Sequence, residues 1–332
     1  MRVLGFPFNI YLAAFASALV ASFVALPLWR AWCIRTGLVD DPGHRKIHDT
    51  PIPLAGGLAV LTGLLLPLVI ATVLLKFNLI GETSSAPLLH GLNKRALQLA
   101  AIAFGAVGMT IIGLLDDKHE LRPAHKFVGQ LLIAGIVAAA GVRITLFVPS
   151  VVFSYVVTIL WLLTVINAFN FMDNMNGLCS GLGAIGAGMF GFIAATRGPD
   201  PQGQYLVAAT AFLICGALMG FLPHNFPKAR AFLGDAGSHL VGYLLAVLAI
   251  LPHFYDKSEP RPWAVISPLL VLAVPLGDLA WVVVLRWRMG KPFYMGDTNH
   301  LSHRLVRLGL AKPVAVILIW LLAALIGGIA LI

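Results

Sequence analysis

Long apolar runs separated by short polar segments make up most of this 332-residue chain. A helix needs about 20 consecutive, mainly apolar residues to cross a lipid bilayer. By that measure the pattern predicts ten spans and leaves room for an eleventh. The ten predicted spans are residues 8–29, 54–75, 96–115, 127–142, 150–167, 177–196, 204–222, 236–251, 263–285 and 313–332. The predicted fold class is therefore all-α, a polytopic membrane helix bundle.

The connections between these runs are too short to carry a second domain. The longest, 30–53 and 286–312, are too small to bury a core of their own, and the chain shows no convincing internal repeat. We therefore expect residues 1–332 to form a single integral membrane domain. The first apolar run is longer than the core of a signal peptide, about 7 to 15 residues, which predicts a first span rather than a cleaved leader.

The composition supports this class. Hydrophobic residues make up 59% of the chain and charged residues only 11%, whereas soluble domains carry about 25% charged residues. The formal net charge of +9 comes from basic residues scattered between the apolar runs. That distribution favours lipid headgroups and phosphate-bearing substrates over nucleic acid. The three cysteines have no metal-like spacing, and we interpret them as small apolar residues.

Lysine and arginine are divided unevenly between the two sides that ten spans define. The loops after the odd-numbered spans carry fifteen of them, and the opposite side, including the N-terminus, carries eight. Cytoplasmic loops of membrane proteins are enriched in Lys and Arg. We therefore predict a plasma (inner) membrane protein with its odd-numbered loops in the cytoplasm and both termini outside. Almost every polar cluster of the chain falls on that cytoplasmic side.

The third predicted span runs directly into an acidic pair, Asp116 and Asp117, in a loop that ends at Lys126. Two adjacent carboxylates repel each other unless a cation or a proton intervenes, and oxygen ligands at that density suit Mg²⁺. The alternative is that the pair only marks the point where the helix meets water. The preceding cytoplasmic loop could bind phosphate or be an ordinary basic loop. Its three basic residues are Arg45, Lys46 and His48.

The fifth predicted span continues into a run of amides and one acid. Asn167, Asn170 and Asp173 recur at every third residue, so on a continuing helix they stay on one face. We expect these three side chains to converge on one point at the end of the helix. Asn176 and Gly177 are then predicted to break the helix and to start the next span.

Two further loops carry candidate chemistry. Asp235 lies in a glycine-flanked turn, where the next helix would offer free N–H groups to an anion and Asp235 could hold a metal. The alternative is that Asp235 only caps that helix. His300 and His303 lie three residues apart and could form a zinc pair, a phosphate clamp or neither. Zinc is the weakest of these because no third soft ligand lies nearby. Asp278, inside the ninth span, must face the bundle interior or a polar cavity.

Taken in order, these five clusters resemble the polyprenyl-phosphate N-acetylhexosamine-1-phosphate transferases. That family includes UDP-GlcNAc:undecaprenyl-phosphate GlcNAc-1-phosphate transferases and phospho-MurNAc-pentapeptide translocase. The resemblance covers about Asp41 to Gly309. The elements that carry it are Asp41-Pro42 with Arg45-Lys46 and His48, Asp116-Asp117, Asn167 and Asn170 with Asp173, the run from Phe232 to Ser238, and His300 with His303-Arg304.

The chain departs from the family pattern at two positions. Asn176 stands where the family usually has a second Asp, so a metal role at that position is in doubt. Ser302 stands where the family usually has a His, which leaves His300 and His303 to make whatever phosphate contact the loop provides.

The resemblance implies roles for the remaining residues. Asp235 would be the direct Mg²⁺ ligand, with Mn²⁺ as a substitute, and Asp117 and Asp173 would support the metal or the substrate. Asp116 is the candidate for deprotonating the lipid phosphate, and a covalent phosphosugar intermediate on an Asp stays open as an alternative. The residues expected to bind substrate or phosphate are Arg45, Lys46, His48, Lys126, Asn167, Asn170, Asn176, His300, His303 and Arg304.

The implied reaction joins a UDP-sugar and undecaprenyl phosphate, forms undecaprenyl-pyrophosphoryl-sugar and releases UMP. It would be the first membrane step of a surface polysaccharide such as lipopolysaccharide or teichoic acid, and the resemblance also implies a homodimer. GlcNAc-1-phosphate transfer is the favoured interpretation, and phospho-MurNAc-pentapeptide transfer for peptidoglycan is the alternative. A secondary transporter, from a different class, would suit Asp278 and the glycine-broken helices, but it needs polar groups near the bilayer midplane.

Overall fold

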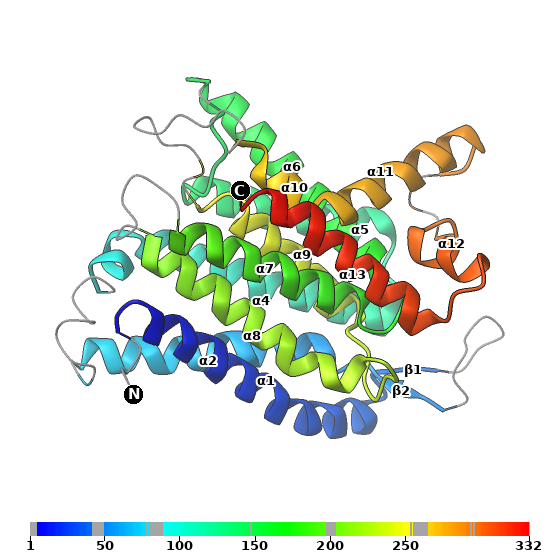
Figure 1. Ribbon diagram of the computed structural model, residues 1–332, viewed down its shortest axis with the longest axis horizontal. Coiled ribbons are helices and arrows are strands. Elements are labelled where there is room, and N and C mark those ends of the chain that lie inside the picture. Colours follow the sequence, from blue (N-terminus) through cyan, green and yellow to red (C-terminus); the bar gives the residue numbers. More distant parts are fainter. Residues whose placement is uncertain are drawn as a thin grey trace.

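The computed structural model is a bundle of long helices that lie roughly side by side (Figure 1). It describes residues 5–41, 50–77, 79, 89–146, 148–196, 204–252, 254, 265–292, 294 and 296–331. Its elements are α1 (Phe8–Thr36), β1 (Val39–Asp40), β2 (Ile52–Pro53), α2 (Gly56–Lys76), α4 (Ala96–His119), α5 (Pro123–Ala139), α6 (Val151–Met172), α7 (Leu178–Thr196), α8 (Tyr205–Asn225), α9 (Gly234–Leu248), α10 (Ser267–Val271), α11 (Ala273–Arg288), α12 (Leu301–Arg307) and α13 (Lys312–Ile329). The predicted phosphate-binding residues Arg45, Lys46 and His48 lie outside the described residues.

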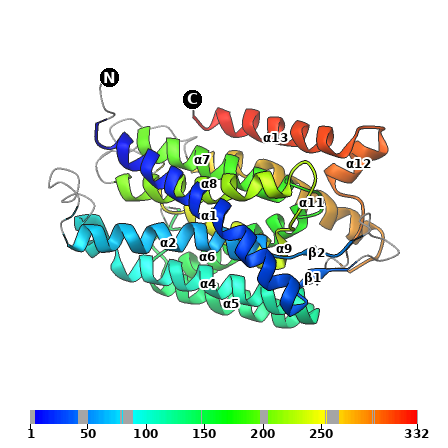
Figure 2. The same cartoon turned by 90° about the horizontal axis from the view of Figure 1, so that it is seen from below.

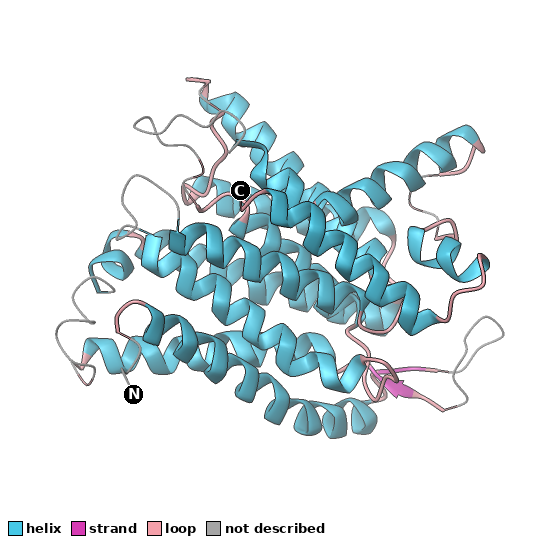
Figure 3. Cartoon of the chain, in the orientation of Figure 1, coloured by secondary structure: helices cyan, strands magenta, loops and turns pink. Residues whose placement is uncertain are grey.

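Seven of the described helices are long and apolar enough to cross a membrane: α1, α2, α4, α6, α7, α8 and α13. Helix α5 is apolar but shorter, and α9 has 15 residues. The prediction of an all-α, multi-pass membrane protein is therefore confirmed, while the count of ten spans stays a prediction. The described strands, β1 and β2, form one short antiparallel ladder in which Val39 is opposite Pro53 (Figure 3).

The ninth predicted span, 263–285, was wrong as a continuous helix. The structure divides it into α10 and α11, with Leu272 between them. Pro275 explains the break, because it has no N–H to donate to the carbonyl of Val271 and its ring would clash with that carbonyl. The break brings Asp278 into the second turn of α11, where it is only 5% exposed. Asp278 therefore faces the bundle interior, as predicted.

Helix α1 also extends beyond its predicted end at residue 29. It continues to Thr36 and ends at Gly37, whose φ of 69° is the left-handed conformation that glycine adopts without strain. Arg30 and Arg35 therefore lie on the last two turns of a helix rather than in a loop. Trp29 and Arg30 are residue types typical of the point where a helix leaves the bilayer, but neither interrupts a helix.

Helix α9 forms the centre of the bundle. Every one of its residues except Asp235 is buried, and it packs against α2, α4, α6 and α7 (Figures 1 and 2). Small residues permit this close contact at its first turn. A Cβ atom on Gly113 would overlap the backbone of Ala236, and one on Gly57 would lie 2.5 Å from the backbone nitrogen of Gly237. The start of α2 and the last turns of α4 therefore lie so close to the start of α9 that their backbones are in contact.

Backbone hydrogen bonds fasten the start of α2 to the turn before α9. The N–H of Gly56 donates to the carbonyl of Phe232 at 2.9 Å, and the N–H of Gly57 donates to that of Leu233 at 3.1 Å. The N–H of Phe232 in turn donates to the carbonyl of Pro53 at 3.0 Å. One end of the bundle thus gathers the hairpin, the start of α2, the end of α4 and the start of α9.

Candidate active site

Asp117, in the last turn of α4, holds the first turn of α9. Its Oδ1 accepts a hydrogen bond from the N–H of Asp235 at 2.8 Å, and its Oδ2 accepts one from the N–H of Ala236 at 3.1 Å. A carboxylate at a helix N-terminus satisfies free N–H groups and interacts favourably with the helix dipole. The prediction that this turn offers free N–H groups to an anion was therefore wrong for these two residues, because Asp117 occupies them.

Asp116 and Lys126 form an ion pair next to this cap. The Lys126 Nζ lies 2.5 Å from Oδ2 of Asp116, whose side chain is 5% exposed, and 3.7 Å from Oδ2 of Asp235. The other oxygen of Asp116 accepts the N–H of Leu121 at 2.9 Å. Lys126 therefore lies between two carboxylates, with a quarter of its side chain exposed. The buried Asp116 orients the ammonium group toward the more exposed Asp235.

Of the two predicted asparagines on α6, Asn170 reaches the acidic turn. Its Nδ2 donates to Oδ1 of Asp235 at 2.7 Å and to Oγ of Ser238 at 2.9 Å. Asn167 instead donates to the buried Gln130 of α5 at 3.0 Å and to the carbonyl of Leu163 at 2.8 Å. The three side chains therefore do not all converge on one point: Asn170 reaches Asp235, while Asn167 joins α6 to α5.

Asp173 follows the last residue of α6 and is half-buried. Burial, followed by the negative charges of Asp235 and Asp117, raises the pKa of Asp173 well above its usual range. Within the described ranges, no hydrogen bond to its carboxylate is found. The three acids that the sequence singled out thus lie within electrostatic range of one another. The carboxylate of Asp173 is the one that lacks a compensating donor.

Replacing Asp173 with Asn separates stability from catalysis. The raised pKa means that the folded chain binds this proton more tightly than the unfolded chain, so stability falls as pH rises through the folded-state pKa. Without divalent cations, Asp173→Asn should have a higher melting temperature than the parent at pH 8, and a smaller increase at pH 5.

Enzymatic activity should fall about 100-fold in Asp173→Asn, because the variant removes an anionic group from the site. Thermal unfolding and turnover measure the two effects, with the exposed Glu120→Gln as control. A lower melting temperature at pH 8 contradicts the assignment.

The turn between α6 and α7 is fixed by asparagines rather than by acids. Gly177 has a φ of 76°, and its N–H donates to Oδ1 of Asn225 at 2.6 Å. This confirms the predicted break. Nδ2 of Asn176 donates to the carbonyl of Pro227 at 3.2 Å, in the connection between α8 and α9. Asn176 therefore fastens two loops together, a role that suits an amide where the family usually has an acid.

His300 is oriented by the intramembrane acid that the sequence left without a partner. Its Nδ1 lies 2.6 Å from Oδ2 of Asp278, and the N–H of Leu301 donates to Oδ1 of the same carboxylate at 2.7 Å. The His300 ring also packs edge-on against Phe171 of α6, with the ring centroids 5.6 Å apart. Ser302, where the family usually has His, donates to Oδ1 of Asn174 at 2.6 Å. The segment that carries His300 and His303, called the histidine loop below, is thereby attached to residues on both sides of Asp173.

An Arg–Asp pair that the sequence did not single out supports the same loop. Nε of the buried Arg286 lies 2.9 Å from Oδ2 of Asp297, and its guanidinium stacks 4.8 Å from the centre of the Phe171 ring. Burial alone would raise the pKa of Asp297, but the bonds from Arg286 and from the Asn299 N–H lower it below its usual range. The available signal in the sequence was an arginine at the end of an apolar run, eleven residues before an acid.

The remaining basic residues of this region lie on and around α12. The guanidinium of Arg304 stacks on Trp281 of α11, 4.9 Å from the ring centre. His303 is half-buried, and burial, followed by the nearby His300 and Arg307, lowers its pKa. The two histidine rings lie 6.4 Å apart between centroids. Among the described residues, zinc has no set of three His, Cys, Asp or Glu ligands.

Removing the carboxylate behind His300 should weaken substrate binding without unfolding the chain. Asp278→Asn keeps the size of the side chain and an acceptor for Leu301, but it presents an amide group to Nδ1 and frees the ring to turn. Misplacing a binding group by about 1 Å can lower the rate about 100-fold. We expect KM to rise about 100-fold and kcat to fall by a smaller factor. Steady-state kinetics tests this, and unchanged kinetics would show that His300 needs no orientation.

The geometry fits a magnesium ion that is completed by substrate. No group of three or more His, Cys, Asp or Glu side chains in the described part of the chain is arranged to hold a metal alone. Mg²⁺, however, is usually held by one or two carboxylates together with substrate phosphates. Asp235, whose side chain is 33% exposed, and the unbonded Asp173 match that pattern. Asp117 matches it less well, because both of its oxygens already accept N–H groups.

Comparison with known proteins places this cluster in a family. A sequence profile for glycosyl transferase family 4 matches residues 99–253. A decaprenyl-phosphate N-acetylglucosaminephosphotransferase of Mycobacterium tuberculosis is 32% identical in an alignment of 333 positions. The alignment covers 93% of this chain and 79% of that protein. The chain belongs to glycosyl transferase family 4. The matched region contains all four candidate catalytic acids, Asp116, Asp117, Asp173 and Asp235.

Other family 4 members agree over nearly the whole chain. A probable undecaprenyl-phosphate N-acetylglucosaminyl 1-phosphate transferase of Bacillus subtilis is 29% identical over 317 residues, covering 93% of this chain and 81% of that protein. An undecaprenyl-phosphate alpha-N-acetylglucosaminyl 1-phosphate transferase of Yersinia pestis is also 29% identical, over 97% of this chain and 82% of that protein. The similarity therefore includes the histidine loop as well as the acidic centre, by which we mean Asp116, Asp117, Asp173 and Asp235 with Lys126.

Proposed function

We propose that this chain transfers GlcNAc-1-phosphate from UDP-GlcNAc to undecaprenyl phosphate, forming undecaprenyl-pyrophosphoryl-GlcNAc and UMP. The names of its relatives support the acceptor class and the transferred group. One structural observation supports it most: Lys126 lies between Asp116 and Asp235 at the N-terminus of α9, with Asp117 and Asp173 nearby. Such a cluster of alternating charges can position phosphates without a covalent step.

The reaction is an in-line displacement at the sugar-bearing phosphorus. An oxygen of the lipid phosphate forms the new P–O bond, and the bond to the UMP oxygen breaks, so no redox partner or water is consumed. Lys126 would bind a transferring or leaving phosphate oxygen, and Asp235 and Asp173 would hold Mg²⁺. When bound, that ion would neutralise the charge that develops on the phosphate oxygens. His300, oriented by Asp278, would bind a further phosphate.

Asp116 is better suited to positioning Lys126 than to proton transfer. Both of its oxygens already have partners, the ammonium of Lys126 and the N–H of Leu121. A phosphate monoester with a second pKa near 6 is also largely dianionic at pH 7, so the attack does not require a base. We propose direct displacement by the lipid phosphate. A base role for Asp116 would appear as a loss of activity in Asp116→Asn at pH 6 that recovers near pH 8.

Membrane placement follows the positive-inside bias. We propose that the acidic centre faces the cytoplasm at the inner membrane, where UDP-sugars are made, and that α5, α9 and the broken α10–α11 pair complete ten crossings. In that arrangement the polar groups of the site gather at one face, which argues against a secondary transporter. The transporter class would instead place them near the midplane.

A transfer assay with purified protein in vesicles tests the function. UDP-GlcNAc labelled in its sugar is supplied with undecaprenyl phosphate and Mg²⁺, and label in the lipid extract is measured together with released UMP. We expect equal amounts of lipid-linked label and UMP, and none after chelation of the metal. UDP-GalNAc and UDP-MurNAc-pentapeptide, supplied in parallel, identify the donor. Label that enters the vesicle lumen without UMP release would contradict transfer and support transport.

A further inference from the structure

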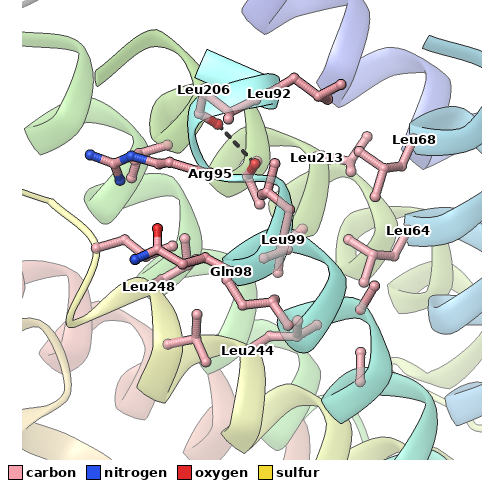
Figure 4. Close-up of a pocket in the computed structure, with 18 of the residues that line it drawn as sticks. Leu64, Leu68, Leu92, Arg95, Gln98, Leu99, Leu206, Leu213, Leu244 and Leu248 are labelled. Carbon is pink, nitrogen blue, oxygen red and sulfur yellow. Dashed lines mark hydrogen bonds between the residues drawn. The ribbon is translucent and has the colours of Figure 1, made fainter. Parts of the chain in front are cut away.

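A cavity of about 280 Å³ lies between α2, α4, α8 and α9, apart from the acidic centre (Figure 4). Leucine is the commonest residue in its wall, and six of these leucines are Leu64, Leu68, Leu99, Leu213, Leu244 and Leu248. They come from four different helices and point toward one another in Figure 4. The volume is near the lower limit of small-ligand pockets, about 300 Å³.

The threonine hydroxyls and the Gln98 amide in this wall already donate to backbone carbonyls. Oγ1 of Thr210 donates to the carbonyl of Leu206 at 2.8 Å, the bond drawn in Figure 4. Nε2 of Gln98 donates to the carbonyl of Gly141 at 3.2 Å. A cavity with mainly apolar walls stays dry and takes apolar ligands. In a membrane protein, the apolar ligand at hand is a hydrocarbon chain.

One charged side chain lines the cavity. Arg95 immediately precedes α4, and in Figure 4 its guanidinium lies to one side of the leucines. In the described part of the chain, the side chain of Arg95 forms no hydrogen bond, ion pair or ring stacking. A guanidinium matches the oxygen geometry of a phosphate and binds it with two hydrogen bonds. A hydrocarbon slot with an unpaired guanidinium at its side has the chemistry of a phospholipid, with one apolar chain and one anionic headgroup.

The distance to the acidic centre distinguishes this lipid from the proposed substrate. Arg95 and Asp116 lie at opposite ends of α4, and 21 residues of helix separate them by about 30 Å. The acceptor phosphate of a polyprenyl substrate must lie near Lys126, at the Asp116 end. A lipid whose phosphate contacts Arg95 is therefore a second molecule, in the opposite leaflet.

We propose that this cavity binds one acyl chain of an anionic phospholipid, with the lipid phosphate on Arg95. Hydrocarbon that fills the space between α2, α4, α8 and α9 would support the packing of the central helix α9 near its C-terminal end, while the acidic centre lies at its N-terminal end. The proposal depends on the cavity and on Arg95 alone and would stand if the donor sugar were different.

Native mass spectrometry of the detergent-solubilised full chain tests this site. Dioleoyl-phosphatidylglycerol, dioleoyl-phosphatidylcholine and undecaprenyl phosphate are titrated separately, and the bound lipid per chain is counted. Ala103→Phe places a ring in the cavity, and Ala100→Phe adds the same ring to the exposed face of α4, one turn away. Arg95→Gln removes the charge beside the cavity, and the exposed neighbour Lys94→Gln removes one that does not line it.

We expect the parent chain to retain one phosphatidylglycerol and to prefer it to phosphatidylcholine. Arg95→Gln should weaken phosphatidylglycerol binding about tenfold, the effect of one charge-assisted contact, and Ala103→Phe should abolish it. The Lys94 and Ala100 controls should match the parent. Equal binding in Arg95→Gln and Lys94→Gln would overturn the headgroup assignment. Undecaprenyl phosphate that binds instead, and is lost in Ala103→Phe, would overturn the choice of lipid.

Discussion

Asp235→Asn should abolish transfer while leaving the chain folded. Asp235 is the only residue of α9 that is not buried, and its carboxylate contacts both Asn170 and Lys126. The asparagine keeps the size of the side chain and an acceptor for Asn170, but it removes the negative charge that would hold a divalent cation. Removing one electrostatic group from a preorganised site lowers kcat about 100- to 1,000-fold. We expect a loss at the upper end of this range, because Lys126 would also lose its second carboxylate.

The test for Asp235 compares turnover with folding in the same preparation. Label transferred to undecaprenyl phosphate gives kcat, and thermal unfolding gives the melting temperature. Glu120→Gln, in the loop that follows α4, removes an exposed acid from the same end of the bundle and should behave like the parent chain. Near-normal turnover in Asp235→Asn would show that the Asp235 carboxylate is not needed for transfer.

Unlike Asp235→Asn, the Asp117→Asn variant should lose folding stability together with activity. Both oxygens of Asp117 accept N–H groups from the first turn of α9. An asparagine can accept only one of them and presents its own N–H₂ to the other. Leaving one buried donor unsatisfied costs about 1–3 kcal/mol, and losing the charge at the helix N-terminus adds to that. Since α9 is the most enclosed of the described helices, this destabilisation should spread to α2 and α4.

Thermal unfolding of Asp117→Asn beside Asp235→Asn distinguishes a structural cap from a metal ligand. We expect a clear drop in melting temperature for the first variant and little change for the second. Activity in Asp117→Asn should recover in part at lower temperature, where more of the protein is folded. A variant as stable as the parent but inactive at all temperatures would mean that Asp117 acts directly on substrate or metal.

The membrane class and the acidic centre could be predicted because both leave a local mark on the sequence. Apolar runs of membrane length have few alternatives to helix, and an acid such as Asp116 at the end of such a run is too unfavourable in lipid to lack a partner. The order of the clusters then predicted that Asp117, Asp173 and Asp235 would meet. Asp117 accepts the N–H of Asp235 at 2.8 Å, and burial, followed by the charges of both acids, raises the pKa of Asp173, so the three lie close together.

The separate roles of those acids could not be predicted, because each role depends on which group the carboxylate contacts in the fold. The sequence treats Asp116 and Asp117 as a pair. On the helix they point in different directions, one toward Lys126 and the other toward the N–H groups of α9. Asp278 and His300 are likewise 22 residues apart, and only the break before Pro275 and the turn of the histidine loop bring them together. Neither contact has a sequence spacing that predicts it.

Mn²⁺ binding, measured by electron paramagnetic resonance on the purified chain, tests the central claim most directly. That claim is that acids from the end of α6 and the start of α9 share one divalent cation with the substrate phosphates. The account predicts one Mn²⁺ per chain in the presence of UDP-GlcNAc, lost in Asp235→Asn, weakened in Asp173→Asn and unchanged in Glu120→Gln. The same affinity and stoichiometry in all four proteins would contradict it.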